Sequence, residues 1–510
     1  MAGTSSNKII AKNTVLLYTR MLFVMLISLY TSRVILQKLG IDDYGIYQTV
    51  GGIVGLLSFI NGALSSGTSR FLTFELGRND KEKLRKTFST TLTVHICIAI
   101  MVVVLAETFG YWFLYNKLLI PVERLNAAIF VFHISIITAV FTLTQVPYTA
   151  VIIAHEQLSV FAYIGIFEVV AKLLILYLLN IGNCDKLILY AIMLFFVQLL
   201  IVLFYRIYCH KKYEETKYSF FIDKQIFKSV AGFSSWSLIA SGSSALNNQG
   251  ILMLLNMFFS PAVVAARAIS IQVNMAVNQL VTNFRTAVNP QIVKRYASGD
   301  YAGSMMLLLT STKYSYYLSL LICLPLFFLV EPLLKYWLSI LPEFTVVFVK
   351  LIIVQALFQV FDTSFYTALY AKGRLRENAL ISPVLGLLQF PLVYVLFKMG
   401  YSPILLSWVN LCLYALLGLV VKPILLVRIV GYKWADIGMV FKSCVIVTIC
   451  ALPFPLLLVY FVDVDSLNIL RVIVLVVFLA LVVVMSVYFV GIDKKTRTAI
   501  KSIIVRYFRL

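Results

Sequence analysis

Long runs of uncharged, apolar residues recur along the whole chain and restrict what it can fold into. Clear examples occupy 187–205, 386–397, 404–421 and 472–492. About 20 such residues suffice to cross a hydrocarbon core of about 30 Å as a helix. Only 13% of the 510 residues are charged and 61% are hydrophobic. The strands of a transmembrane barrel would instead appear as segments of about ten residues in which apolar and polar side chains alternate. We therefore expect an all-α, polytopic membrane protein.

The spacing of these runs predicts about fourteen transmembrane helices. The first residues carry no signal-peptide cleavage pattern, so the first apolar segment is interpreted as a membrane helix. All predicted connections are short, and the longest is 206–228. The expected helices are 14–37, 44–68, 87–115, 123–152, 158–180, 186–208, 228–257, 261–289, 304–330, 342–370, 378–398, 402–428, 439–461 and 468–491.

Two pseudo-symmetric halves are expected, because short motifs recur at a fixed shift. "SRFLTFELGRND" ends at Asp80 and "NPQIVKRYASGD" ends at Asp300, 220 residues later. We predict an N-terminal six-helix bundle over 1–215, a C-terminal six-helix bundle over 216–430, and two further helices with a basic tail over 431–510. The first helix of each half begins on the same side of the membrane. Such halves are related by an axis along the membrane normal, and a substrate would bind between them.

Lysine and arginine are distributed unequally between the two predicted sides. With the N-terminus in the cytoplasm, the segments on that side, helix ends included, hold 28 of these residues and the opposite segments hold 6. Because cytoplasmic loops retain positive residues, both termini are predicted to be cytoplasmic. Much of the net charge of +21 then faces anionic membrane lipids, which are an expected partner, and nucleic acid is not.

One predicted helix, 261–289, carries a stripe of polar side chains. Arg267, Asn274, Asn278 and Arg285 are spaced by 7, 4 and 7 residues. At 100° per residue they lie within about 20° of one direction. Lipid does not tolerate such a face, so it must meet protein or water. We interpret it as the wall of a cationic, substrate-binding cavity. The alternative is that both arginines pair with acids of neighbouring helices and only hold the bundle together.

The preceding segment, "SWSLIASGSSALNNQG" at 235–250, is uncharged but rich in hydroxyls and amides. Asn247 and Gln249 are candidate substrate-binding residues, since a sugar needs many neutral hydrogen bonds. Close helix packing through small residues is the alternative, and it suits the serines and glycines best. Positive charge in the first half would come from Arg20, Arg33 and Arg70, although Arg70 could also reach headgroups from a helix end.

Few acidic residues are expected inside the membrane. Glu168 and Lys172 are four residues apart and should neutralise each other. Asp362 has no cation within one turn of its own helix and is the candidate for coupling to H⁺ or Na⁺, with Glu107 second. His95 and His133 are interpreted as isolated core histidines. The seven cysteines show no metal-ligand spacing, and no catalytic or metal site and no cofactor are expected.

The segment "TSRVILQKLGIDDYGIYQTVGGIVGLLSFINGALSSGTSRFLTFELG" at 31–77 resembles the start of Wzx-type polysaccharide-unit flippases. These belong to the multidrug/oligosaccharidyl-lipid/polysaccharide exporter superfamily. "AKGRLRENA" at 371–379 is also typical of that family, and the helix count agrees along the whole chain. The LG…YG pattern comprises Leu39, Gly40, Tyr44 and Gly45.

The resemblance implies a V-shaped, two-bundle fold with a central cationic cavity in the bacterial inner membrane. It implies transport of undecaprenyl-pyrophosphate-linked oligosaccharide repeat units for O-antigen or capsule, alongside other polysaccharide-assembly proteins, and no enzymatic activity. A cation-coupled multidrug exporter of the same fold remains an alternative, although the excess of arginine argues against it. A membrane-embedded polymerase is a further alternative, and the short loops argue against that.

Overall fold

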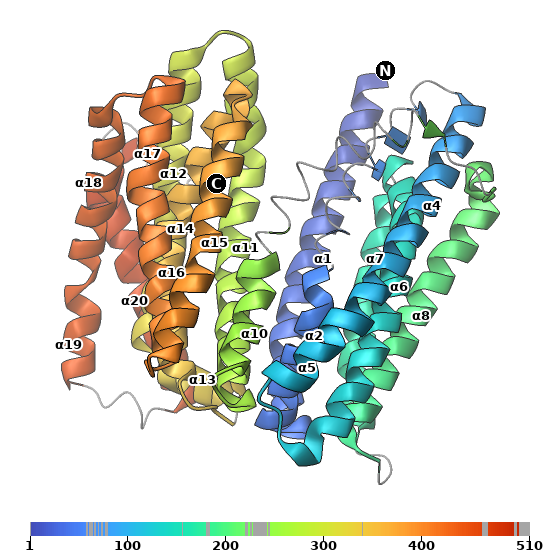
Figure 1. Ribbon diagram of the computed structural model, residues 1–510. Coiled ribbons are helices and arrows are strands. Elements are labelled where there is room, and N and C mark those ends of the chain that lie inside the picture. Colours follow the sequence, from blue (N-terminus) through green and yellow to red (C-terminus); the bar gives the residue numbers. More distant parts are fainter. Residues whose placement is uncertain are drawn as a thin grey trace. The chain divides into compact units, whose positions relative to one another are not determined.

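The computed structural model describes residues 2–57, 80–155, 157–179, 184–219, 245–338, 340–461 and 468–493, with isolated residues between them. The side chains of 2–20 and 375–379 are not described. Throughout this described part the regular structure is helical (Figure 1). Eleven of its helices are long and apolar enough to cross a membrane. The predicted all-α membrane fold is confirmed.

The chain divides into two compact units, 1–268 and 269–510. The division falls inside the long helix α11 (Pro261–Ala297). The boundary predicted at residue 215 was inferred from the internal sequence repeat. A division into compact units does not test that repeat, so the boundary stays a prediction.

The first unit is built around α6, which packs against α2, α4 and α8, while α1 packs against α7. Helix α4 continues through a π-helical turn, η1, into α5, so that one span runs from Lys81 to Lys117. The elements are α1 (Ala2–Leu39), α2 (Ile41–Leu57), α4 (Lys81–Leu105), η1 (Ala106–Gly110), α5 (Tyr111–Lys117), η2 (Val122–Arg124), α6 (Leu125–Ala154), α7 (Leu158–Leu178), α8 (Lys186–Lys212), η3 (Glu214–Thr216), η4 (Leu246–Gly250) and α10 (Ile251–Asn256).

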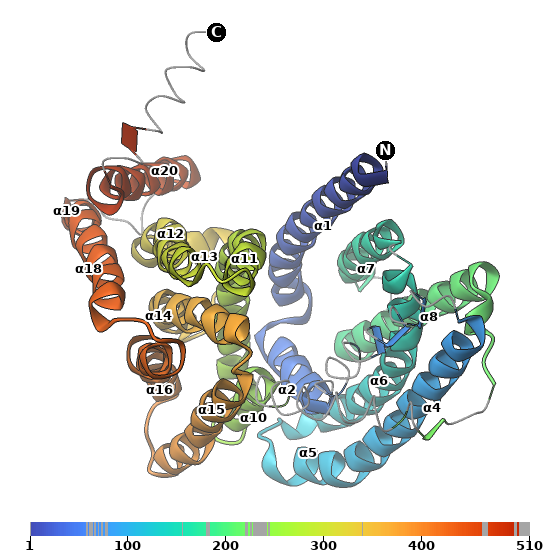
Figure 2. The same cartoon turned by 90° about the horizontal axis from the view of Figure 1, so that it is seen from above.

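The second unit is centred on α12 and α14, which lie side by side (Figures 1 and 2). Their interface is aromatic, and the ring of Tyr316 stacks on that of Phe361 at a centroid distance of 5.3 Å. The elements after α11 are α12 (Tyr301–Phe328), α13 (Val330–Leu338), α14 (Thr345–Lys372), α15 (Leu375–Lys398), α16 (Ile404–Leu416), η5 (Leu417–Val421), α17 (Lys422–Leu425), η6 (Leu426–Val430), α18 (Trp434–Ala451), α19 (Pro453–Phe461), α20 (Ile469–Ser486) and η8 (Val487–Gly491).

Three predicted helices are missing from the eleven apolar spans. The described part of 44–68 is the short helix α2, and most of 228–257 lies outside the described residues. The range 261–289 is α11, which is long enough to cross a membrane but too polar to count as an apolar span. The polar character of α11 is therefore real and needs a functional or structural explanation.

The two recurring motifs end at equivalent structural positions. Asp80 caps α4, where its carboxylate accepts a hydrogen bond from the backbone N–H of Lys83 at 3.0 Å. Asp300 caps α12 in the same way, with the N–H of Gly303 at 2.8 Å. Because an N-cap aspartate satisfies a backbone donor that the helix leaves unpaired, the repeated aspartate starts the third helix of each predicted half.

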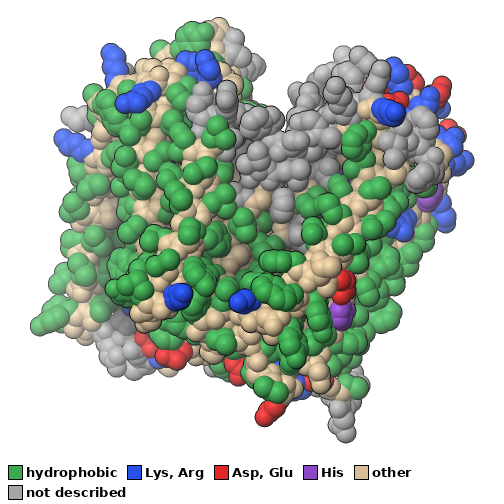
Figure 3. Space-filling view, in the orientation of Figure 1, with side chains coloured by type: hydrophobic (Ala, Val, Ile, Leu, Met, Phe, Trp, Pro, Cys, Tyr) green, Lys and Arg blue, Asp and Glu red, His purple; other side chains and the backbone are tan. Residues whose placement is uncertain are grey.

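Charged side chains lie mainly toward the helix ends. On the visible face, hydrophobic side chains cover most of the described flank of each unit, and Lys and Arg gather mostly toward one end (Figure 3). A broad apolar flank with a basic end is the pattern expected for helices in a bilayer whose basic end faces the cytoplasm.

Candidate functional site

The polar face of α11 meets α14 inside the second unit. The side-chain amide of Asn278 donates to Oε1 of Gln359 at 3.2 Å and to Oδ1 of Asn274 at 2.8 Å. Further along, the guanidinium of Arg285 donates to the carbonyl oxygen of Thr363 and to Oγ1 of Thr367. Three of the four residues in the predicted stripe therefore lie in one polar seam between α11 and α14.

A second layer of polar groups extends this seam. Thr367 on α14 donates through its hydroxyl to Oδ1 of Asn289 on α11 at 3.3 Å. Most of these partners are neutral hydroxyls, amides and carbonyls. In the apolar interior of a membrane such groups must be hydrogen-bonded, so the seam holds α11 and α14 together while presenting further donors and acceptors.

Asp362 is paired, which corrects the expectation that it lacks a cation. Its Oδ1 lies 3.0 Å from Nζ of Lys422; the lysine side chain is buried and that of Asp362 is 17% exposed. Lys422 is far away in the sequence and belongs to α17, so the search for a cation within one turn of Asp362 could not find it. The side chain of Lys422 is only 3% exposed. Whether Asp362 takes part in ion coupling remains a prediction.

Two π-helical turns flank the short segment that carries Lys422. The turn η5 comes directly before α17 and the turn η6 directly after it. In η5, Gly418 lies against α14 so closely that a Cβ there would be 2.6 Å from the carbonyl oxygen of Phe358. Because the backbones of η5 and α14 approach closely at Gly418, the side chain of Lys422 can reach Asp362 on α14. Such π turns are often found at functional positions.

The seam and the ion pair together carry one excess positive charge. Asp362 and Lys422 neutralise each other, and the hydrogen bonds of Arg285 go to a carbonyl and a hydroxyl. A partly exposed arginine with neutral partners keeps its charge and its planar set of donors. The arrangement therefore suits an anion such as a phosphate, with hydrogen-bonding groups beside it.

The remaining candidate residues lie in the first unit. Arg267 is buried, with 3% of its surface exposed, and Arg33 is partly exposed; both make interactions with other residues. The side chain of Arg20 and the whole of Arg70 lie outside the described residues. The structure therefore brings Asn274, Asn278 and Arg285 together, and the binding roles of the other candidates remain predictions.

The amide-rich segment around 247–249 serves helix packing at least in part. Asn247 and Gln249 lie in η4, which packs against α2. A Cβ on Gly52 would be 3.3 Å from Oε1 of Gln249, and one on Gly55 would be 3.5 Å from its Cγ. The side chain of Gln249 thus lies over the glycines of α2, and the packing alternative for the serines at 241–244 falls mostly outside the described residues. A role in binding sugar is not tested by these contacts.

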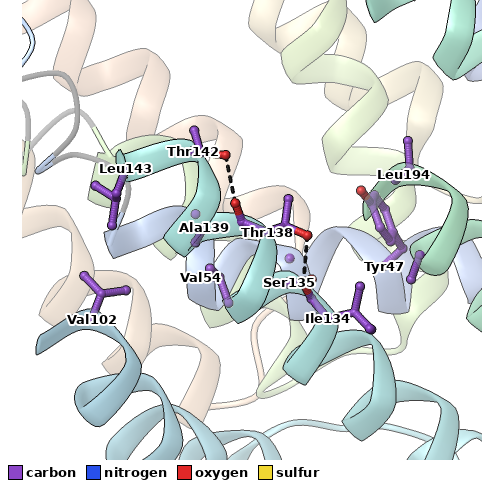
Figure 4. A pocket seen from close by; sticks show the side chains of 13 residues that line it. Tyr47, Val54, Val102, Ile134, Ser135, Thr138, Ala139, Thr142, Leu143 and Leu194 are labelled. Carbon is purple, nitrogen blue, oxygen red and sulfur yellow. Dashed lines mark hydrogen bonds between the residues drawn. The ribbon is translucent and has the colours of Figure 1, made fainter. Parts of the chain in front are cut away.

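A cavity of about 240 Å³ lies within the first unit, lined by α2, α4, α6 and α8 (Figure 4). Ser135, Thr138 and Thr142 line it from α6, and Tyr47 from α2. The three hydroxyls donate to carbonyl oxygens of their own helix at 2.7, 2.8 and 2.9 Å. Their spacing of three and four residues marks one face of a helix. The sequence interpretation missed this signal. Because each hydroxyl proton is donated to a carbonyl oxygen of α6, the cavity offers a ligand mainly apolar surface and hydroxyl oxygens that can accept hydrogen bonds.

Two further acids predicted to lie in the membrane, Glu168 and Glu107, are also paired. Glu168 bonds Lys172 at 2.6 Å, as predicted. Glu107 lies 3.0 Å from Nδ1 of His133, which corrects the expectation that both are isolated. His95 is buried, with Nδ1 2.7 Å from the carbonyl oxygen of Thr91, as expected for a core histidine. Among the described residues, no group of three or more His, Cys, Asp or Glu could hold a metal ion.

Comparisons with solved structures show where this fold occurs. Lipid II flippase MurJ, in an inward closed conformation, matches with a TM-score of 0.72 and 13% identity over 93% of this chain and 99% of its own. A MATE-family multidrug resistance transporter of the MOP superfamily matches with a TM-score of 0.66 and 14% identity over 84% and 99%. A MOP superfamily transporter from Pyrococcus furiosus matches with a TM-score of 0.56 and 14% identity over 85% and 96%.

The chain has the fold of these transporters. No protein-family model and no curated protein matches the sequence. At 12–14% identity the structural likeness concerns the fold alone. The three neighbours named above are described as a flippase or as transporters.

Proposed function

We propose that this chain is a flippase for undecaprenyl-pyrophosphate-linked oligosaccharide repeat units in the bacterial inner membrane. It moves them from the cytoplasmic to the periplasmic leaflet by alternating access, for assembly of a surface polysaccharide such as O-antigen or capsule. The fold shared with a lipid II flippase supports a transporter of this class. The Wzx-type sequence pattern around Leu39 and Tyr44 supports the choice of substrate.

The observation that carries the proposal is Arg285, an arginine inside a membrane bundle whose hydrogen bonds go to neutral groups. A pyrophosphate diester carries two negative charges and matches the planar donors of a guanidinium. Asp362 does not cancel the charge of Arg285, because Lys422 already neutralises that carboxylate. The seam therefore retains a cation that an anionic headgroup can use.

The neutral groups of the seam suit the oligosaccharide. Asn278, Gln359 and Asn289 offer amides on the same two helices as Arg285. Sugar hydroxyls both donate and accept, so side-chain amides pair with them without any cost of burying a charge. Arg267 lies 18 residues before Arg285 on α11, about 27 Å away along the helix. One headgroup cannot contact both, so we assign Arg285 to capture and Arg267 to a later step.

A multidrug exporter is the second candidate, because MATE transporters share the fold. An exporter of cationic drugs requires a carboxylate that the drug can neutralise. In the described part of the second unit, Asp362 already has Lys422 as its counter-charge and Glu331 pairs with Lys335. This arrangement favours an anionic substrate over a cationic one.

The test uses a strain from which the gene is deleted. Accumulation of undecaprenyl-pyrophosphate-linked oligosaccharide, measured by mass spectrometry, together with loss of surface glycan, is expected. The wild-type gene should reverse both effects. Arg285→Ala should fail to do so and Arg285→Lys should restore transport in part, while Arg428→Ala, an exposed arginine of the same unit, should restore it fully. Normal glycan combined with increased sensitivity to cationic drugs would instead identify an exporter.

A further inference from the structure

A groove on the second unit lies between α12 and α18, two helices that pack against each other. It has a volume of about 510 Å³. Its walls include the flexible side chains of Met305, Met306 and Met439. Met306 and Met439 are 72% and 62% exposed. Unbranched, polarizable methionine side chains adapt to irregular apolar partners, so this surface suits acyl chains.

Two lysines line the same groove, Lys313 from α12 and Lys442 from α18. Lys313 comes 12 residues after the start of α12 at Tyr301, which is about 18 Å along the helix. Lys442 comes eight residues after the start of α18 at Trp434, or about 12 Å. Both helices begin at the end predicted to be cytoplasmic. The lysines thus lie within the inner-leaflet half of the bilayer, and their stems can bend back toward the headgroups.

The charge of these two lysines is not neutralised within the groove. The ion pairs in the described part of this unit include those of Lys335 with Glu331 and of Lys422 with Asp362, and neither involves a lysine of the groove. Asp436 also lines the groove, but it lies more than 4.0 Å from both ammonium groups and leaves one excess positive charge. A charged side chain at membrane depth is costly and rare unless it has a partner. An anion from the membrane would supply that partner.

We propose that this groove binds an anionic phospholipid of the cytoplasmic leaflet. Its phosphate lies between Lys313 and Lys442, and its acyl chains lie along the methionines. The hydroxyl of Thr310, which lines the groove one helical turn before Lys313, faces the ester carbonyls. Basic pockets between helices on the cytoplasmic side bind lipid headgroups in this way. This proposal does not depend on the proposed transport activity.

The test measures lipid binding to the purified, detergent-solubilised full-length protein by native mass spectrometry. Dioleoyl-phosphatidylglycerol is the anionic probe and dioleoyl-phosphatidylcholine the zwitterionic one. We expect the first to bind more tightly, and added salt to weaken it. Lys313→Met and Lys442→Gln should each reduce its affinity about 5-fold, and both together about 30-fold. The affinity of the zwitterionic lipid should not change.

The matched control is Lys350→Met on α14, a lysine that does not line the groove and lies 5.9 Å from the ring centroid of Phe327. It should bind the anionic lipid like the wild type, and Lys313→Arg should also retain binding. If Lys313→Met does not fold, the exposed Lys442→Gln carries the test alone. Equal binding of both lipids, or an unchanged affinity in the lysine variants, would overturn the proposal. Binding of a polyprenyl phosphate in place of phosphatidylglycerol would assign the groove to the transported lipid and also overturn it.

Discussion

Removing the carboxylate from the buried Asp362–Lys422 pair should destabilise the second unit strongly. At the observed separation of 3.0 Å, the attraction amounts to about 5–6 kcal/mol with an effective dielectric constant of about 20. Asp362→Asn keeps the shape of the side chain but leaves a buried ammonium without its counter-charge. Loss of one partner from a buried pair costs about 3–5 kcal/mol.

That cost translates into a measurable change in thermal stability. For a unit of 242 residues (510 − 268), about 3–5 kcal/mol corresponds to a fall of about 10 °C in the apparent melting temperature. Fluorescence-detected size-exclusion chromatography after heating measures this shift. The double variant Asp362→Asn/Lys422→Met removes both charges and should recover most of the loss, because no charge then remains buried without a partner.

Transport by the same variants separates stability from coupling. If the pair is only structural, the double variant should carry glycan at nearly the wild-type rate. If Asp362 also takes up H⁺ or Na⁺ during transport, the double variant should be stable but inactive. The reasoning is refuted if Asp362→Asn melts at the wild-type temperature, or if the double variant is less stable than Asp362→Asn.

Three further predictions concern topology, substrate binding and packing. In a cysteine-free background, Glu214→Cys should resist labelling from the periplasm and Ile340→Cys should react; labelling of the first would reverse the predicted orientation. Arg285→Glu should abolish surface glycan while the protein stays monodisperse in detergent, and normal glycan would remove Arg285 from the mechanism. Gly418→Val should lower stability by about 1–3 kcal/mol, since its side chain would meet a backbone carbonyl of α14. Gly438→Ala, where a Cβ meets nothing within 4 Å, should be neutral in the same thermal assay.

Hydropathy was sufficient to locate most helices. The segment predicted at 342–370 is α14 (Thr345–Lys372), and the one predicted at 186–208 is α8 (Lys186–Lys212). Apolar length predicts a span because the bilayer imposes the same requirement on every helix. Helical periodicity was also sufficient to predict which side chains of α11 share a face. The spacing of Asn274, Asn278 and Arg285 places them on one side of the helix, and all three lie in the polar seam.

Pairings between helices could not be predicted in this way. Asp362 and Lys422 are 60 residues apart in the sequence (422 − 362), and Lys422 follows directly on the π-helical turn η5, where Gly418 approaches α14 closely. A regular 3.6-residue period would have given Lys422 a different direction. The pair Glu107–His133 was missed for the same reason, because its partners come from different elements.

The π-helical turn η5 makes the chain tolerant of a change in its length at one place. A π turn holds one residue more than an α-helix needs over the same rise. Deleting one residue of Leu419–Val421, which keeps Gly418, would convert the turn into regular α-helix and leave the flanking segments in their places. The same deletion inside α14 would turn every later residue of that helix by about 100° and expose its buried face. Natural variants of this chain that differ in length within a membrane helix are therefore expected at η5 and its counterparts, where a lost codon does not disturb the packing on either side.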